Sequence, residues 1–177
     1  MANFSTMPVY LTVQPENVKI DNKTLEEVKK FADSLLKVLK LENLELSLVF
    51  TDDKTIRQLN REWRGKDKPT DVLSFPQDFP EMDLEGNKEP AEVLNEVIRN
   101  CKGCKILGDI VISLDTAQKQ AKDFDWSFEN ELKRLVLHGM VHLLGFDHEK
   151  SPIDEKKFRE IENFLWNLVE KEKPFRW

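Results

Sequence analysis

The sequence of 177 residues lacks several features that would assign it to particular classes of protein. No run of about 18 apolar residues occurs, so we expect no transmembrane helix. The N-terminus has no basic stretch followed by an apolar one, so we expect no signal peptide and a cytoplasmic location. The composition, with 40% hydrophobic and 34% charged residues, is that of an ordinary soluble globular protein.

Cysteine is scarce, with two residues in the stretch CKGC. No second cysteine pair is present to complete a zinc site built from cysteines, and no βαβ pattern surrounds the stretch to indicate a redox motif. We therefore interpret Cys101 and Cys104 as incidental to function. A disulfide between them or a weak metal site remains open.

Positively charged residues are also in deficit, because the chain has 27 Lys and Arg but 33 Asp and Glu, which gives a net charge of −6. This balance disfavours a protein whose whole surface binds nucleic acid. One basic stretch, RQLNREWRGKDKP, is an exception. It indicates either a solvated helix face or a local phosphate-binding patch. Its basic residues are Arg57, Arg61, Arg64, Lys66 and Lys68.

Strand-like and helix-like segments are mixed without a strict βαβ rhythm, which predicts an α+β fold with a small mixed β-sheet flanked by helices. We expect one domain over residues 1–177, with an irregular excursion at 78–105. Thr24 and Glu27 read as a capping box at the first helix. About four strands are expected, at 9–13, 44–50, 71–76 and 105–114, the last being central. Helices are expected at 22–40, 53–63, 90–100, 115–124, 127–145 and 151–173.

All three histidines of the chain lie in one stretch, HGMVHLLGFDH. His138 and His142 are four residues apart in an expected helix, so their imidazoles leave the same face. Gly145 can adopt a left-handed conformation and turn the chain back, which would let His148 approach the same point. Three imidazoles with an open fourth position predict a catalytic zinc site at the end of this helix.

This stretch resembles a zinc-protease signature but departs from it at one position. Such proteases carry a glutamate general base directly after the first histidine, and Gly139 occupies that place. A zinc-bound water would remain a nucleophile without it. Asp147 or Glu149 could assist, and for Asp147 we favour the orientation of an imidazole over acid–base work.

Three stretches together resemble the YbeY family of metal-dependent endoribonucleases. They are HGMVHLLGFDH, LNREWRGKDKPTDVLSFP and LGDIVIS, all between Leu59 and His148. The resemblance implies that the three histidines bind zinc and that Arg64 lines the same cleft and is needed for activity. A guanidinium suits phosphate oxygens and stays charged, so this pairing is chemically reasonable for a phosphodiesterase.

The resemblance further implies a zinc-dependent, single-strand-specific endoribonuclease in 16S ribosomal RNA 3′-end maturation and ribosome quality control. Its partners would be ribosomal RNA and the small ribosomal subunit, with no membrane and no nucleotide cofactor. Arg61, Lys66 and Lys68 could contact the RNA backbone, with surface solubility as the alternative. Two other functions stay open: a non-catalytic ribosome-assembly factor with structural zinc, and a metallohydrolase of other substrates such as peptides.

Overall fold

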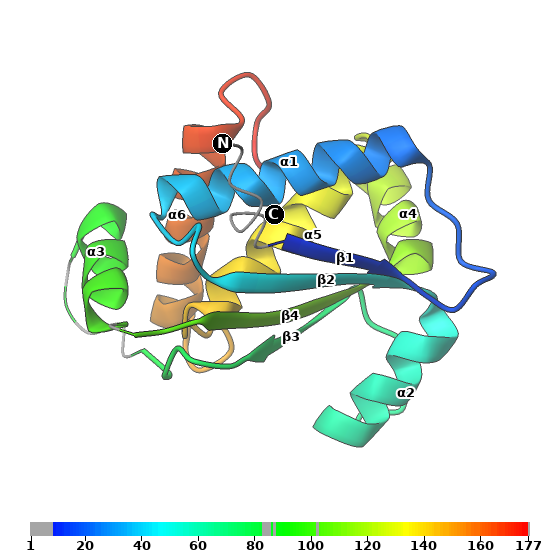
Figure 1. Cartoon of the computed structure of the whole chain (residues 1–177), viewed down its shortest axis with the longest axis horizontal. Helices are drawn as coiled ribbons and strands as arrows, with labels where there is room; N and C mark the ends of the chain where they lie inside the picture. The colour runs from blue at the N-terminus through cyan, green and yellow to red at the C-terminus, as the bar shows by residue number, and fades with distance from the viewer. Residues whose placement is uncertain (1–8, 83–85, 87, 102, 177) are drawn as a thin grey trace, which may run out of the picture.

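Four strands form one mixed sheet in the order β1-β2-β4-β3 (Figure 1). The computed structural model describes residues 9–82, 86, 88–101 and 103–176. Strands β1, β2 and β4 run parallel, and β3 pairs antiparallel with β4. The α+β class and the mixed four-stranded sheet are therefore confirmed, and β4 is an interior strand as predicted. The strands are β1 (Val9–Val13), β2 (Glu45–Thr51), β3 (Val72–Pro76) and β4 (Ile106–Ser113).

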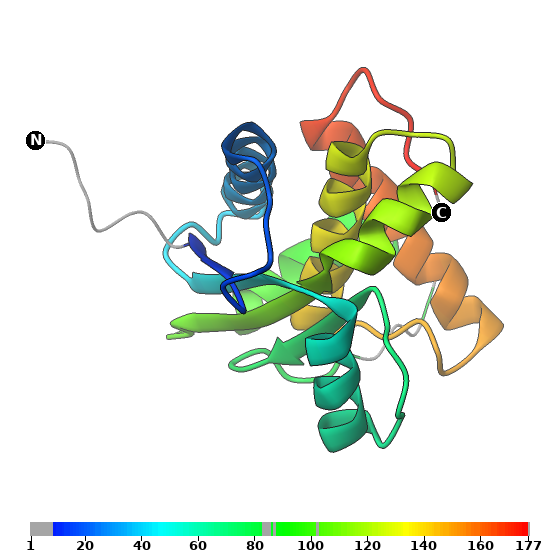
Figure 2. The ribbon, with the colours of Figure 1, turned by 90° about the vertical axis from the view of Figure 1, so that its right-hand side faces the viewer.

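Helices cover both faces of this sheet, but unequally. Figure 2 shows α1, α4, α5 and α6 gathered on one side of the sheet and α2 on the other. No helix in the described part of the chain is long and apolar enough to cross a membrane. The helices are α1 (Asn22–Val38), α2 (Asp53–Arg64), α3 (Pro90–Asn100), α4 (Leu114–Asp123), α5 (Phe128–Leu143) and α6 (Pro152–Val169).

The helix ends follow side-chain chemistry, with one correction to the expected caps. The capping box predicted at Thr24 and Glu27 is wrong. Asp21 is the N-cap of α1, and its carboxylate accepts a hydrogen bond from the Thr24 amide at 2.9 Å. An ionised carboxylate satisfies these first amides better than a hydroxyl does, since charge-assisted hydrogen bonds are stronger. Ser127 and Ser151 cap α5 and α6 with their side-chain oxygens.

The main core lies between the sheet and the larger layer of helices. Alternate residues of β2, namely Leu46, Leu48 and Phe50, are fully buried, as the period of a half-buried strand requires. Helix α5 runs through this core, and ten of its sixteen residues are buried. A smaller apolar cluster of Ile56, Leu73 and Val111 holds α2 against the other face. The sheet and α5 therefore form a rigid base from which functional side chains can project.

Strand β3 forms one edge of the sheet, and its outer side carries few free amide donors. Ser113 donates its amide to the Asp71 carbonyl at one end, and Gln77 donates to Leu107 at the other. Because antiparallel hydrogen bonding alternates, the groups of the even-numbered residues 72, 74 and 76 point away from β4. Val72 donates its amide to its neighbour's carboxylate, and Pro76 has no amide hydrogen.

The excursion at 78–105 contains the expected short helix, although residues 83–85, 87 and 102 lie outside the described part. Leu94 and Val97 of α3 belong to the main core, so this helix packs as part of the fold. The amides of Lys105 and Ile106 both donate to the Asp78 carboxylate, at 2.8 and 2.9 Å, which closes the base of the excursion. The two cysteines, Cys101 and Cys104, form a disulfide, one of the alternatives left open by the sequence.

Candidate metal centre

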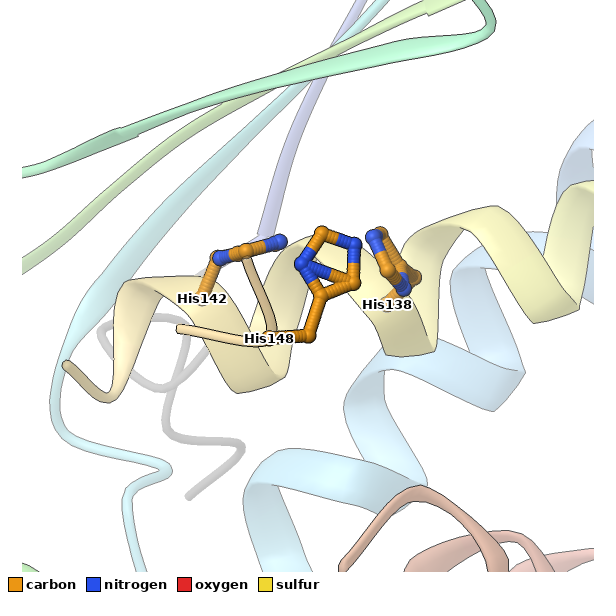
Figure 3. A group of neighbouring side chains, drawn as sticks. All are labelled: His138, His142 and His148. Atoms are coloured by element: carbon orange, nitrogen blue, oxygen red, sulfur yellow. The ribbon is translucent and has the colours of Figure 1, made fainter. Parts of the chain in front are cut away.

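Three imidazoles meet where α5 ends (Figure 3). His138 and His142 project from α5, and His148 comes from the loop that follows it. The ring centroids are 4.8 to 5.0 Å apart. One ring nitrogen from each of the three residues lies within 4.8 Å of the others. The spacing predicted from the sequence therefore does bring the three histidines together, in a group that could hold a metal ion.

Gly145 makes this convergence possible, as the sequence predicted. Its φ of +102° lies in the region that favours glycine. A Cβ at this position would lie 2.2 Å from the Pro80 carbonyl oxygen. The Gly145 carbonyl in turn accepts the Met82 amide at 2.8 Å. The reversal that returns His148 to α5 is therefore packed against the segment after β3 and has no room for a side chain.

Hydrogen bonds orient two of the three imidazoles. His138 Nδ1 lies 3.1 Å from Glu162 Oε2, and His142 Nδ1 lies 3.0 Å from the Phe146 carbonyl oxygen. A carbonyl can only accept, and an ionised carboxylate does the same. Both Nδ1 atoms therefore carry the proton, and both Nε2 atoms keep a free lone pair. This is the arrangement that metal-binding histidines adopt.

The third imidazole differs, because His148 Nδ1 is buried without a hydrogen-bond partner in the described part of the chain. A buried polar atom left unpaired is costly, and a metal ion at this point would satisfy the ring. All three rings also lie on the buried Phe158 of α6, with centroid separations of 4.8 to 5.1 Å. The donor set thus fits a metal that accepts neutral imidazole nitrogens.

Burial keeps the middle imidazole neutral. Burial, together with charge repulsion from the neighbouring His138 and His148, lowers the pKa of His142 from 6.5 to about 3. A metal ligand must be deprotonated, so His142 is ready to bind at neutral pH without first losing a proton. We call the three histidines, held by α5, α6 and the intervening loop, the metal wall.

Gly139 lies under this wall, and its surroundings explain why no glutamate stands there. A Cβ on Gly139 would lie 2.8 Å from Ile110 Cγ2 on β4. Helix α5 therefore touches Ile110 of the sheet at this residue. A glutamate here would point into the core instead of toward a metal-bound water. The protease-type general base is sterically excluded from this position.

The imidazoles face a cavity of about 620 Å³, and Arg64 lines it as well. The Arg64 guanidinium comes from the last residue of α2 and lies 3.5 Å from the Glu149 carboxylate. On this side the cavity is bounded by Trp63, Arg64 and β3, which we call the open wall. The structure thus brings Arg64 to the histidines across a long separation in sequence.

Asp147 also lines the cavity, but its carboxylate makes no hydrogen bond to an imidazole among the described residues. Its Oδ1 accepts the Glu149 amide at 2.9 Å and is 3.8 Å from His148 Nδ1. The Glu149 amide and the nearby imidazoles hold the pKa of Asp147 below its usual value. The carboxylate is therefore an acceptor at neutral pH.

The remaining basic residues of the sequence patch stand outside the cavity. Arg57 donates to Asp67 at 2.9 Å, and Arg61 lies 4.0 Å from the same carboxylate. Lys66 and Lys68 are exposed beside them and do not line the cavity. The patch is thus partly neutralised by Asp67, and Arg64 is its one member at the site.

A buried polar network supports the metal wall, and sequence reasoning missed it. Glu131 is fully buried and accepts hydrogen bonds from Arg134, Gln120 and Trp126. Gln120 also donates to Asp71, where β3 begins. This network ties α5 to the start of the open wall. Its sequence signal was a charged pair inside an apolar helix, and Glu162 gave the same signal in the buried stripe of α6.

The protein thus combines an α+β fold with a three-histidine site that could hold a metal ion. This site opens onto a cavity that an arginine also lines. The family model described as endoribonuclease YbeY matches residues 10–170. The chain therefore belongs to the endoribonuclease YbeY family. The match extends beyond the three stretches between Leu59 and His148 to reach β1 and α6, and it spans the excursion.

Individual relatives support the same family assignment. Endoribonuclease YbeY of Aquifex aeolicus is 47% identical over 146 residues, which cover 82% of this chain and 84% of that protein. The Petrotoga mobilis relative of the same name is 35% identical over 167 residues, covering 94% and 99%. A solution structure of a Thermotoga maritima protein shares the fold, with a TM-score of 0.51, 24% identity and 90% coverage of both chains.

Proposed function

We propose that this protein is a zinc-dependent, single-strand-specific endoribonuclease that acts in 16S ribosomal RNA 3′-end maturation and ribosome quality control. One observation carries the proposal: the three histidines and Arg64 line the same cavity. A metal-binding group beside a guanidinium suits hydrolysis of a phosphodiester. The curated relatives bear the name of endoribonucleases, which supports RNA as the substrate.

Zinc is the ion that best suits the metal wall. It accepts neutral imidazoles, and three protein ligands with one open position are typical of its catalytic sites. When bound, it lowers the pKa of a coordinated water towards about 7, so that a nucleophile forms at neutral pH. His138, His142 and His148 would hold one ion per chain, with Nε2 as the donor atom of the first two.

The chain's own residues would bind the phosphate, accept the proton of the water and keep the imidazoles in place. Arg64 would exchange its 3.5 Å contact with Glu149 for two oxygens of the scissile phosphate and stabilise the charge that develops there. Asp147, held ionised, would accept a proton from the attacking water, because an ionised carboxylate cannot act as the acid. Phe158 and the α5–α6 packing would keep the imidazoles fixed throughout.

The wider setting follows from the proposed substrate. Arg61, Lys66 and Lys68 would guide the RNA backbone towards the cavity through long-range charge attraction. The small ribosomal subunit would be the partner and the cytoplasm the place of action. The acidic net charge of −6 suits an enzyme that meets its RNA through one local basic edge.

The decisive experiment is cleavage of precursor ribosomal RNA by zinc-loaded protein beside His142→Ala purified identically. We expect cleavage by the former alone, together with loss of bound zinc in the variant. Equal cleavage by both would identify a contaminating nuclease and favour the non-catalytic assembly factor. Arg64→Ala adds the mechanistic test, since it should keep zinc and lose about 10²- to 10³-fold in rate.

A further inference from the structure

Trp63 is an exposed tryptophan at the mouth of the metal cavity. Its residue surface is 69% exposed, the highest fraction among the exposed large hydrophobic residues in the described part of the chain. The others are Tyr10, Val38, Ile106, Ile153 and Leu168. Of these six, Trp63 alone lines the cavity that contains the histidines. An exposed aromatic ring at the mouth of this cavity is available to stack on a ligand.

The fold holds this indole in place even though water surrounds it. Trp63 lies in the last turn of α2, next to Arg64, and its ring meets the Phe75 ring of β3 at 5.8 Å and 71°. The helix ends at Gly65 with a φ of +69°, and the Gly65 amide donates to the Arg61 carbonyl at 3.1 Å. The indole therefore contacts β3 through Phe75 and keeps most of its surface open to water.

The chemistry of the neighbours identifies what would cover it. An exposed aromatic ring accepts a nucleobase by stacking, and the interaction is tolerant of sequence because every base has a π-face. The adjacent guanidinium of Arg64 matches a phosphate, and the metal wall lies across the same cavity. Groups suited to a base, a phosphate and a metal ion thus line one cavity.

We propose that Trp63 is a stacking platform for one unpaired nucleobase beside the scissile phosphate. The proposal rests on the function proposed above and deepens it. In a duplex, each base is stacked on both faces and unstacking it costs free energy. A platform next to the centre therefore favours nucleotides that are already unpaired, which gives the enzyme a physical reason to prefer single strands.

The test is single-turnover cleavage of a single-stranded RNA by zinc-loaded protein, with enzyme in excess and its concentration varied. Half-saturation reports binding, and the plateau reports the chemical step. Trp63→Ala should raise the half-saturating concentration by roughly 5- to 150-fold, the effect of one lost base stack. Trp63→Phe should restore most of the binding. Tyr10→Ala, an exposed aromatic at the opposite edge of the sheet, should change nothing.

An abasic substrate separates stacking from other roles. A series of RNAs, each with one abasic site near the cleaved bond, should contain one that weakens binding to the wild type as Trp63→Ala does. On that RNA, Trp63→Ala should show no further weakening of binding compared with the wild type. Unchanged half-saturation for Trp63→Ala with intact RNA would overturn the proposal, as would equal losses on every abasic RNA. Unchanged half-saturation would point to a protein partner or a structural role for the indole.

The two proposals can fail separately. If wild-type protein cleaves no RNA, the proposed nuclease function fails. If it cleaves RNA and Trp63→Ala binds it equally well, the function stands and only the platform is wrong. A matched melting temperature for wild type and Trp63→Ala shows that the variant is folded, which its high exposure leads us to expect.

Discussion

The two walls of the cavity are built in opposite ways. In the metal wall, His138 bonds Glu162, His142 bonds a carbonyl, and all three rings rest on buried Phe158. In the open wall, the Arg64 side chain is 39% exposed and has one distant carboxylate partner, and Trp63 stands largely in water. Two of the three imidazoles of the metal wall are held by hydrogen bonds before any ligand binds, whereas the side chains of the open wall are largely exposed to water.

This difference would suit an enzyme whose three histidines hold a metal ion. Metal ligands must be held in one geometry, because misplaced donors weaken binding and alter the reactivity of the ion. Groups that bind a flexible polymer need to exchange water for substrate with little reorganisation. The comparison teaches that rigidity in this protein is concentrated where the ion would sit. Four changes test this contrast.

The largest effect should come from Gly139→Glu, which breaks the base of the metal wall. The new side chain would enter the contact between α5 and Ile110 of β4, and burying an unpaired carboxylate adds to the steric cost. We expect a loss of more than about 4 kcal/mol of unfolding free energy. Urea unfolding checks this, with Gly139→Ala as a control that should lose about 1–3 kcal/mol. A stable Gly139→Glu protein with new peptidase activity would contradict our account of this position.

Removal of one support of the metal wall should weaken metal binding and leave the open wall intact. Glu162→Ala takes away the acceptor of His138 Nδ1, so the ring loses its fixed tautomer and orientation. Zinc affinity should fall about 10- to 100-fold, as measured by competition with a chelator. Glu162→Gln keeps an amide oxygen that can accept the same proton and should lose less. Equal affinities for Glu162→Ala and wild type would remove this carboxylate from the metal centre.

Lowering the pH should destabilise the zinc-free protein through the metal wall. The folded pKa of His142 is lowered to about 3 from 6.5, so below pH 6.5 the unfolded chain binds more protons there than the folded one. Stability should thus fall as the pH drops from 6.5 towards 3, by up to about 1.4 kcal/mol per unit. Urea midpoints at pH 7, 6 and 5 measure this fall. His142→Ala should flatten the dependence between pH 6 and 5, and an unchanged slope would contradict burial of this imidazole.

The smallest effects should come from the outer rim of the open wall. Lys66→Ala and Lys68→Ala remove exposed charges that do not line the cavity. Each should weaken RNA binding a few-fold at low salt and reduce the slope of log affinity against log salt by about one. Binding titrations at several salt concentrations measure both quantities. A loss confined to one RNA sequence, with the slope unchanged, would show base recognition instead.

The sequence predicted that the three histidines converge, and it predicted the rest of the site only in part. His138 and His142 follow from helix periodicity, and Gly145 from the need for a reversal, since both are local properties of the chain. Glu162 could not be paired with His138 in advance, because that contact depends on how α6 packs on α5. From the sequence, Arg64 could be assigned to the site only through the family resemblance. The cap of α1 was misjudged because Asp21 and Thr24 are both good capping residues.

The free side of β3 has one more consequence. A strand at the rim of a sheet invites strands of other molecules to add to it, and that pairing needs a regular series of amides and carbonyls. Along the outward-facing positions 72, 74 and 76, the Val72 amide is already bonded to Asp71, and Pro76 has none to give. Only Ser74 could donate, which is too little to template a neighbouring strand. This rim therefore offers an incoming strand outward carbonyls but no regular series of amide donors.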